Sequence, residues 1–322
     1  MQLNKVLFTN CELSNEEISL LKNNNIEIIK GDEHLSEDEL IKQLQGCEGY
    51  VIGGSGKATK KVIDSTNLKI INFYGTGYEN FIDLKTAYEK GISIANTPKA
   101  NAYTVAEFTV SLILDSIKQI THLNSLVKQD KWKMRRTFNL KGKTLGVIGM
   151  GTIGHYVAKI MHSGFGMNIV YVSKNSKPIL EKQLKAKKVN LNELMSSSDV
   201  ITIHTPCNDE TKGMIGEKEI DKMQPHAVLI NTARAEIVDG KSLCKALKNN
   251  KLATAAFDVY YQEPTPSKKD DVWGLLSLPD DKFILTPHTA YNSEEAFEGM
   301  NDMVVQNLTA FFKGEKPPYS AS

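Results

Sequence analysis

The chain has 322 residues, a length that favours two domains over one. Hydrophobic residues make up 41% and charged residues 24%, which excludes a disordered or collagen-like chain. The formal net charge is +1, from 39 basic and 38 acidic residues, so charge gives no basis for binding nucleic acid or an anionic membrane. We therefore expect a globular protein whose partner is a small molecule.

Four cysteines, Cys11, Cys47, Cys207 and Cys244, are scattered without close pairs. This spacing favours reduced thiols over a disulfide framework or a zinc site, and no metal is expected. The N-terminal segment turns polar after a short apolar run, unlike a signal peptide, and no stretch approaches the length of a membrane span. These features predict a cytoplasmic location.

Short apolar runs alternate with amphipathic segments along the first third of the chain. This alternation is typical of a parallel sheet with helices packed on its faces. The expected strands are residues 5–10, 26–31, 49–54, 69–75 and 93–98, and segment 14–25 is typical of the helices between them. One α/β unit is predicted here.

Apolar residues at three-and-four spacing over residues 102–129 predict one long helix that bridges two domains. After the basic loop 131–143 the alternation restarts. Strands are expected at 144–149, 169–173, 200–206, 227–233, 254–260 and 283–290. The last helical pattern, 293–314, has no sheet of its own to follow, so we expect it to pack on the first unit.

Together these patterns predict the α/β class, with two doubly wound domains and a cleft between them. A Rossmann dinucleotide-binding domain is expected over residues 100–289. The smaller, flavodoxin-like substrate domain is expected to be discontinuous, formed by residues 1–99 and 290–322.

Gly149, Gly151 and Gly154 have G-x-G-x-x-G spacing between an apolar strand and a helix. In this context Gly149 allows a sharp turn, Gly151 leaves room for a pyrophosphate and Gly154 lets helix and strand approach closely. Backbone N–H groups at the helix start, including those of Thr152 and Ile153, face the phosphates. The alternative is a glycine-rich turn without a ligand.

The next strand ends on Ser173, followed by Lys174 and Lys177, where an acidic residue would bind the ribose of NAD. A carboxylate would repel a 2′-phosphate, whereas a serine hydroxyl and lysine ammonium groups attract one. The segment therefore favours NADP(H). NAD(H) is the alternative, if both lysines are ordinary solvated side chains.

Polar residues follow each later strand, at the edge where doubly wound sheets bind their ligands. Those expected to border the cofactor are His204, Thr205, Pro206, Thr232, Ala233, Asp258 and His288. Arg234, Glu263 and His288 form a set suited to reducing a 2-keto acid. The guanidinium binds the carboxylate and polarises the carbonyl, the imidazole donates the proton, and the glutamate orients the imidazole. Taken singly, each has an ordinary surface explanation.

The segments GVIGMGTIG, HTP, NTARAEIVD, FDVYYQEP and TPHTA resemble, in order and spacing, the motifs of the D-isomer-specific 2-hydroxyacid dehydrogenase family. The resemblance implies that Arg234 binds substrate, that His288 is the acid/base and that Glu263 is its partner. It also implies that Asp258 contacts the nicotinamide carboxamide and that His204 and Pro206 form a wall of the adenine pocket.

The family resemblance extends to FYGTGYENFID, where it implies that the backbone N–H groups of Thr76 and Gly77 bind the substrate carboxylate. TVAEFTVSLIL resembles the start of the interdomain helix, near which members of the family form dimers, so a homodimer through the cofactor domain is expected. Ser173 stands where many NAD-using members have aspartate. Ala235 follows the arginine where glycine is common.

The sequence thus predicts an NAD(P)-dependent oxidoreductase that interconverts a 2-keto acid and a D-2-hydroxy acid. Oxidation of phosphite is an alternative, because the same side chains suit a phosphorus oxyanion. A dinucleotide-sensing regulatory protein, resembling a corepressor related to these dehydrogenases, is another. Tyr291 and segment 53–61 are candidates to contact the substrate side chain, but the sequence does not identify which 2-hydroxy acid is used.

Overall fold

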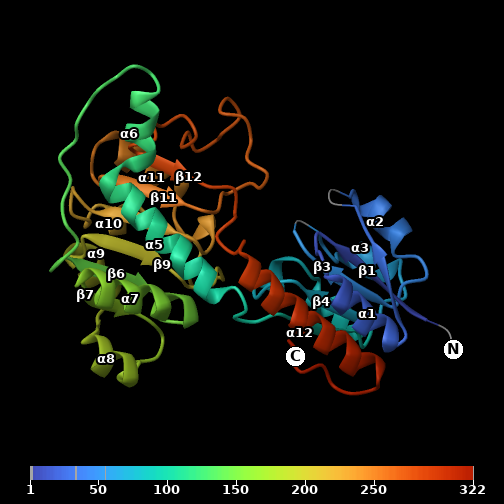
Figure 1. Cartoon of the computed structure of the whole chain (residues 1–322). Coiled ribbons are helices and arrows are strands. Elements are labelled where there is room, and N and C mark those ends of the chain that lie inside the picture. Colours follow the sequence, from blue (N-terminus) through green and yellow to red (C-terminus); the bar gives the residue numbers. More distant parts are fainter. Residues whose placement is uncertain (1–2, 33–34, 55, 322) are drawn as a thin grey trace. The chain divides into compact units, whose positions relative to one another are not determined.

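The computed structural model describes residues 3–32, 35–54 and 56–321. The chain divides into two units, each built on one parallel sheet with helices packed against it (Figure 1). Unit 1 comprises Met1–Asn101 and Asn292–Ser322, and unit 2 comprises Ala102–Tyr291. The predicted α/β class is confirmed.

Unit 1 contains a five-stranded sheet in the order β2-β1-β3-β4-β5, with every neighbouring pair parallel. The strands are β1 (Asn4–Thr9), β2 (Ile26–Lys30), β3 (Gly49–Ile52), β4 (Ile70–Phe73) and β5 (Ser93–Asn96). The order reverses between β1 and β3, which is the flavodoxin-like order predicted for the smaller domain. β3 and β4 are buried along their whole length, so their sequences are continuous apolar runs.

Side-chain caps fix the start of several helices in unit 1. Ser14 and Ser36 each accept a hydrogen bond from the backbone three residues on, while Glu17 and Glu39 bond back to the N–H of the capping serine. The helices of this unit are α1 (Asn15–Asn23), α2 (Glu37–Gln43), α3 (Lys60–Asp64), η1 (Tyr78–Asn80), α4 (Leu84–Glu89) and α12 (Glu294–Phe312).

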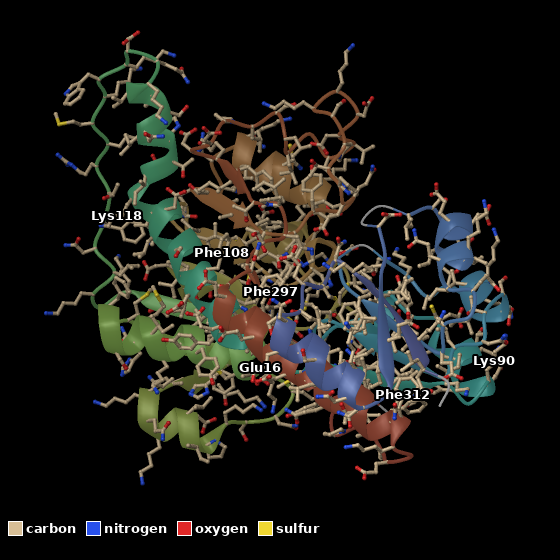
Figure 2. The ribbon with its side chains drawn as sticks, turned by 45° about the vertical axis from the view of Figure 1, so that its right-hand side comes forward. Glu16, Lys90, Phe108, Lys118, Phe297 and Phe312 are labelled. Atoms are coloured by element: carbon tan, nitrogen blue, oxygen red, sulfur yellow. The ribbon has the colours of Figure 1, made fainter. Side chains whose placement is uncertain are left out.

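The C-terminal helix α12 belongs to unit 1 and lies beside α1 (Figures 1 and 2). Its buried Asn307 donates through Nδ2 to Asn72 Oδ1 at 2.7 Å and to the carbonyl of Asn96 at 3.1 Å. The Tyr74 hydroxyl donates to Asn301 Oδ1 at 2.7 Å. These hydrogen bonds attach the end of the chain to β4 and β5.

Unit 2 contains a seven-stranded parallel sheet in the order β12-β11-β10-β9-β6-β7-β8. The strands are β6 (Thr144–Ile148), β7 (Asn168–Val172), β8 (Lys187–Lys188), β9 (Val200–Ile203), β10 (Val228–Asn231), β11 (Thr254–Phe257) and β12 (Phe283–Leu285). The order reverses between β6 and β9, so the loops after these strands meet at the switch point where such sheets bind ligands. The two exposed lysines of β8 gave no apolar signal in the sequence.

The prediction of one helix over residues 102–129 is wrong. Two helices form instead, α5 (Ala102–Lys118) and α6 (Ile120–Val127), because Gln119 between them adopts a left-handed φ of 55°. The other helices of unit 2 are α7 (Thr152–Phe165), α8 (Pro178–Leu184), α9 (Leu191–Ser197), α10 (Glu217–Ile220), η2 (Ala235–Ile237) and α11 (Gly240–Lys248). Across the described residues, no helix is long and apolar enough to cross a membrane.

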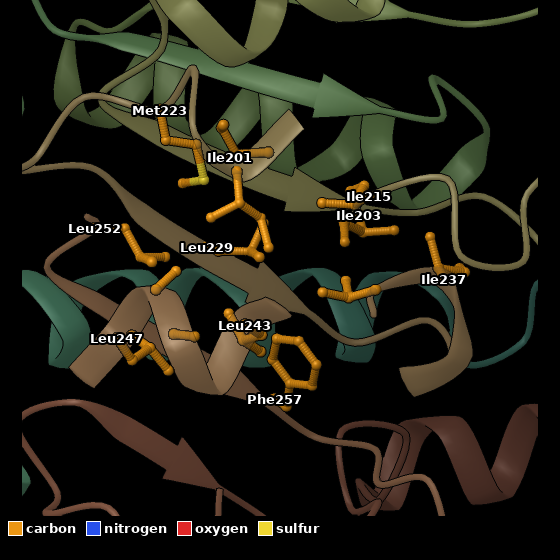
Figure 3. Packing of buried hydrophobic residues seen from close by; sticks show 14 of the residues in the cluster. Ile201, Ile203, Ile215, Met223, Leu229, Ile237, Leu243, Leu247, Leu252 and Phe257 are labelled. Atoms are coloured by element: carbon orange, nitrogen blue, oxygen red, sulfur yellow. The ribbon is translucent and has the colours of Figure 1, made fainter. Parts of the chain in front are cut away.

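Buried apolar side chains cover both faces of the unit 2 sheet. On one face, Leu243 and Leu247 of α11 belong to the same cluster as Leu229 of β10 and Phe257 of β11 (Figure 3). On the other face, a second cluster joins the sheet to α5 and α7. The helices therefore hold the strands in place, and the strand ends carry the polar loops.

Leu229→Ala tests this packing, because Leu229 is 0% exposed in the centre of the sheet. Removing its side chain from a close-packed core should lower the free energy of unfolding by about 2 to 5 kcal/mol, measured by urea denaturation. Val272→Ala is the control, since Val272 is 85% exposed, and its effect should stay within about 0.5 kcal/mol. Equal effects of the two substitutions would contradict the described core.

Candidate active site

The glycine loop joins β6 to α7 at the switch point of unit 2. Gly149 has a φ of 96°, and a Cβ atom there would lie 2.5 Å from the carbonyl oxygen of His204. A Cβ atom on Gly154 would lie 2.2 Å from the carbonyl oxygen of Gly149. Both positions therefore require glycine, the first for its backbone conformation and the second for the close approach of helix and strand.

Gly151 differs from these two glycines because a Cβ atom there would meet nothing within 4 Å. It is the N-cap residue of α7, makes no side-chain capping bond and precedes a first turn without acidic residues. Within the described part of the chain, the N–H groups of Thr152 and Ile153 have no acceptor. The space in front of this helix start is therefore open. Its free N–H donors and partial positive charge suit the phosphates of a dinucleotide.

The end of β7 carries the residues predicted to distinguish NADP from NAD. The strand ends at Val172, so Ser173 and Lys174 follow it directly, beside the glycine-loop strand β6. Lys174 is exposed, and neither Lys174 nor Lys177 is ion-paired with a carboxylate among the described residues. Their charges remain available to an anion.

His204 follows β9 and contacts the glycine-loop strand. Its N–H donates to the carbonyl of Ile148 at 2.7 Å, and its Nε2 lies 2.8 Å from Thr202 Oγ1. Burial lowers the pKa of His204 to about 3, so the ring is neutral at physiological pH. The predicted Thr205 and Pro206 continue this loop, and the carbonyl of Pro206 accepts from Thr211 Oγ1 at 2.6 Å.

Arg234 is held through its backbone by a buried asparagine that the sequence analysis did not single out. Asn231 accepts from the N–H of Ala233 at 3.0 Å and donates to the carbonyl of Arg234 at 2.8 Å. Thr232 Oγ1 lies 3.0 Å from Thr109 Oγ1 of α5. The guanidinium donates to the carbonyl of Ala233 at 2.7 Å and has no carboxylate within ion-pair distance in the described ranges.

His288 and Glu263 form a hydrogen-bonded pair. His288 Nδ1 lies 2.7 Å from Glu263 Oε2, while Glu263 Oε1 accepts from the N–H of Tyr260 at 2.9 Å. His288 has a left-handed φ of 52°, a conformation that a non-glycine residue adopts at some energetic cost and often at functional sites. Both side chains are partly exposed, so Nε2 of His288 is left to contact a ligand.

Opposing effects act on the pKa of Glu263. Burial raises it, but the hydrogen bond and charge of His288, the N–H of Tyr260 and the charge of Arg234 together lower it below the ordinary value. The carboxylate is therefore ionised at neutral pH. The positive charge of Arg234 thus contributes to keeping the pKa of Glu263 low.

Asp258 is 1% exposed and holds the segment that carries His288. Its Oδ1 accepts from the Thr286 hydroxyl and from the N–H of Thr289 at 3.0 Å, and its Oδ2 accepts from the N–H of Ala290 at 2.8 Å. These bonds flank His288 on both sides. Contact of Asp258 with a nicotinamide carboxamide stays a prediction.

The remaining predicted substrate residues lie in different units. In unit 2, the ring of Tyr291 lies edge-on to that of His288, with centroids 6.4 Å apart. In unit 1, Thr76 and Gly77 follow β4, and their N–H groups have no acceptor within the described ranges. No group of three or more His, Cys, Asp and Glu side chains among the described residues is placed to hold a metal ion.

A parallel sheet in this order, with an open glycine loop at the start of a helix, defines a Rossmann dinucleotide-binding protein. An arginine and a histidine–glutamate pair at neighbouring strand ends are the groups that an oxidoreductase acting on an anionic carbonyl compound needs. Residues 110–290 match the NAD-binding domain of the D-isomer specific 2-hydroxyacid dehydrogenases, and the chain belongs to this family. It is an NAD(P)-dependent oxidoreductase acting on a 2-hydroxy acid and 2-keto acid pair.

Relatives and solved structures extend this similarity over nearly the whole chain. A glyoxylate reductase of Thermococcus litoralis is 36% identical over 303 residues, covering 91% of this chain and 89% of the relative. A glyoxylate reductase structure from Paecilomyes thermophila has a TM-score of 0.86 at 28% identity, covering 100% of this chain and 99% of the other. An acyclic imino acid reductase in complex with NADPH and D-arginine has a TM-score of 0.84 at 26% identity, covering 99% and 100%.

Substitutions at Gly154 and Gly151 should distinguish a glycine that is needed for packing from one that leaves room for the ligand. Gly154→Ala should lower the free energy of unfolding by about 1 to 3 kcal/mol, because its Cβ would lie 2.2 Å from the Gly149 carbonyl oxygen. Gly151→Ala should cost less than about 1 kcal/mol but weaken dinucleotide binding roughly tenfold. Denaturant unfolding and NADPH fluorescence titration measure the two effects. Tight NADPH binding by Gly151→Ala would contradict the assignment.

The lowered pKa of His204 predicts that the folded protein loses stability in acid. Its folded pKa is about 3 against an ordinary value of 6.5, so between these values the unfolded chain binds a proton that the folded chain does not. The free energy of unfolding therefore falls as pH decreases from about 6.5. His204→Gln should remove about 3 kcal/mol of the loss between about pH 7 and pH 4. Parallel urea titrations that show the same loss for both proteins would contradict the assigned direction.

Proposed function

We propose that the chain reduces a small 2-keto acid of the glyoxylate type to the 2-hydroxy acid, with NADPH preferred over NADH. The observation that supports this most directly is the His288–Glu263 pair, in which His288 Nδ1 lies 2.7 Å from Glu263 Oε2, on the strand ends that also carry Arg234. All three residues belong to the unit that carries the glycine loop. The glyoxylate reductases similar to this chain support the substrate class.

Arg234 binds the substrate carboxylate in this proposal. Its planar guanidinium can make two parallel hydrogen bonds to a carboxylate, and no described carboxylate competes for it. The same charge polarises the neighbouring carbonyl group. Asn231 fixes the backbone of the Arg234 loop, so the side chain starts from a defined position. The free N–H groups of Thr76 and Gly77 are further candidates to bind the carboxylate.

His288 donates the proton to the carbonyl oxygen. Glu263 is ionised and orients the ring through Nδ1, which leaves the N–H of Nε2 as the donor. The carbonyl oxygen gains this proton, and the imidazole takes up another from solvent afterwards. A nicotinamide cofactor, when bound, would supply the hydride that the carbonyl carbon gains.

The cofactor site is proposed at the carboxyl ends of β6, β7, β9, β10, β11 and β12. Its predicted residues are Gly149, Gly151, Thr152, Ile153, Gly154, Ser173, Lys174, His204, Thr205, Pro206, Thr232, Ala233, Asp258 and His288. The free N–H groups at the start of α7 would bind the phosphates. Ser173 and Lys174 would bind a 2′-phosphate, and the neutral His204 suits the wall of an adenine pocket.

Two further proposals concern assembly and location. Large apolar side chains on α6 and the segment after it are exposed, which supports a homodimer through unit 2. They are Ile120, Val127, Trp132 and Met134, with exposures of 60%, 49%, 87% and 93%. All four cysteines are free thiols, which supports a reducing compartment such as the cytoplasm.

A substrate panel tests the proposed function. Glyoxylate, hydroxypyruvate, pyruvate and a branched 2-keto acid should each be assayed with NADPH and with NADH, by loss of absorbance of the reduced cofactor. The expected result is the highest kcat/KM for glyoxylate or hydroxypyruvate with NADPH. Reduction of NADP by phosphite, without activity on any keto acid, would replace this proposal with phosphite oxidation.

His288→Gln tests the proton donor. Glutamine keeps the size and polarity of the side chain but cannot donate a proton, so kcat for keto acid reduction should fall by about 100-fold or more. The Kd for NADPH should change by less than about threefold. His226→Gln, at an exposed histidine paired with Asp199, is the control and should keep full activity. Substantial turnover by His288→Gln would place the donor elsewhere.

Ser173→Asp tests the cofactor preference. A carboxylate at the end of β7 would accept ribose hydroxyls and repel a 2′-phosphate, so the ratio of kcat/KM for NADPH over NADH should fall about tenfold or more. Ser196→Asp adds the same charge at an exposed position near the end of α9, just before the amino end of β9, and should leave the ratio within about twofold. Equal ratios in the wild type and Ser173→Asp would exclude Ser173 from the site.

A further inference from the structure

The loop after β7 is tied down by one buried hydroxyl. Tyr171 of β7 is 0% exposed, and its hydroxyl donates to Glu181 Oε1 at 2.6 Å and accepts the N–H of Lys177 at 2.8 Å. Lys177 is the N-cap residue of α8, so this pair of bonds joins the strand to the start of the helix. Burial and the hydrogen bond to Glu181 raise the pKa of Tyr171, so the hydroxyl stays protonated and remains a donor.

The other end of the same loop is held from β8. Lys188 Nζ donates to the carbonyl of Lys174 at 3.2 Å, and the N–H of Val189 donates to the carbonyl of Tyr171 at 3.0 Å. Residues 173–177 are therefore fixed at two backbone positions. The ammonium groups of Lys174 and Lys177 themselves stay unpaired among the described residues.

The segment from Ser173 to Lys188 carries mostly positive charge. Between residues 173 and 188 the sequence contains six lysines, at 174, 177, 182, 185, 187 and 188, and a single acidic residue, Glu181. That carboxylate accepts from the Tyr171 hydroxyl and, at 3.4 Å, from the N–H of Lys177. It is engaged with the loop backbone, and within the described ranges it forms no ion pair with a lysine side chain. Tyr171 thus restrains the one negative charge next to the predicted 2′-phosphate position.

We infer that Tyr171 and Glu181 are positioning residues that establish the preference for NADPH. They hold the loop so that Ser173, Lys174 and Lys177 can converge on a 2′-phosphate, and they keep the Glu181 carboxylate from accepting ribose hydroxyls. This inference rests on the proposed preference for NADPH. Neither residue needs to touch the cofactor.

Three variants of the full chain test the inference through the Kd values of NADPH and NADH, measured by fluorescence titration. Tyr171→Phe keeps the buried ring and removes both bonds, so the Kd for NADPH should rise about tenfold while that for NADH changes less than about twofold. Glu181→Gln keeps an oxygen acceptor for Tyr171 and removes the charge, so NADPH binding should be unchanged or tighter.

Glu181→Ala separates positioning from charge, because the two effects have opposite signs. Loss of a negative charge alone would tighten NADPH binding, whereas loss of the hydrogen bond to Tyr171 should weaken it several-fold. Equal weakening of NADPH and NADH in Tyr171→Phe and Glu181→Ala, with a lowered Tm, would reduce the pair to a purely structural role and overturn the inference. Should Tyr171→Phe fail to fold, the comparison of Glu181→Ala with Glu181→Gln decides alone.

Measurements on the wild type distinguish failure of the positioning role from failure of the proposed NADPH preference. If it binds NADPH more tightly and the Tyr171→Phe and Glu181→Ala ratios match it, the positioning role fails and the cofactor preference stands. If the wild type itself does not prefer NADPH, the preference and the positioning role both fail. A selective loss of NADPH affinity in Tyr171→Phe and Glu181→Ala, but not in Glu181→Gln, is the result that supports both.

Discussion

The hydrogen bond between His288 Nδ1 and Glu263 Oε2 is the interaction on which the proposed chemistry depends. It joins the loop after β11 to the loop after β12, and it leaves Nε2 as the only free ring nitrogen. Asp258 reinforces it, because its carboxylate binds the Thr286 hydroxyl before His288 and the N–H groups of Thr289 and Ala290 after it. A buried carboxylate, an ionised glutamate and a left-handed backbone conformation thus place one imidazole at the edge of the sheet.

The glycine loop is a second constraint, and it concerns binding of the cofactor phosphates and not proton transfer. Gly149 and Gly154 are fixed by backbone contacts, while Gly151 leaves open space before the free N–H groups of α7. The loop after the neighbouring strand β7 adds lysines instead of a carboxylate, which suits a cofactor with one more phosphate. Tyr171 ties that loop to α8. Cofactor preference can therefore change through this loop without altering the His288–Glu263 pair.

Much of this architecture could be predicted from local patterns. Strands such as β9 and β10 are short apolar runs followed by polar residues, and G-x-G-x-x-G spacing marks the switch point without knowledge of the fold. What was missed depends on the path of the backbone and on contacts between distant residues. Thr109 meets Thr232 across 123 positions, and Asn231 was not singled out because its role depends on the backbone path of Arg234. The break at Gln119 escaped prediction because apolar periodicity continues through it.

The rate of keto acid reduction by the wild type and by Glu263→Gln, measured side by side at neutral pH, tests the central claim most directly. Glutamine cannot hold the His288 ring through an ionised carboxylate, so kcat should fall by about tenfold or more. The Kd for NADPH should change by less than about threefold, because the glycine loop is not altered. Equal kcat values would contradict the account, because Glu263 would then have no influence on the group that donates the proton.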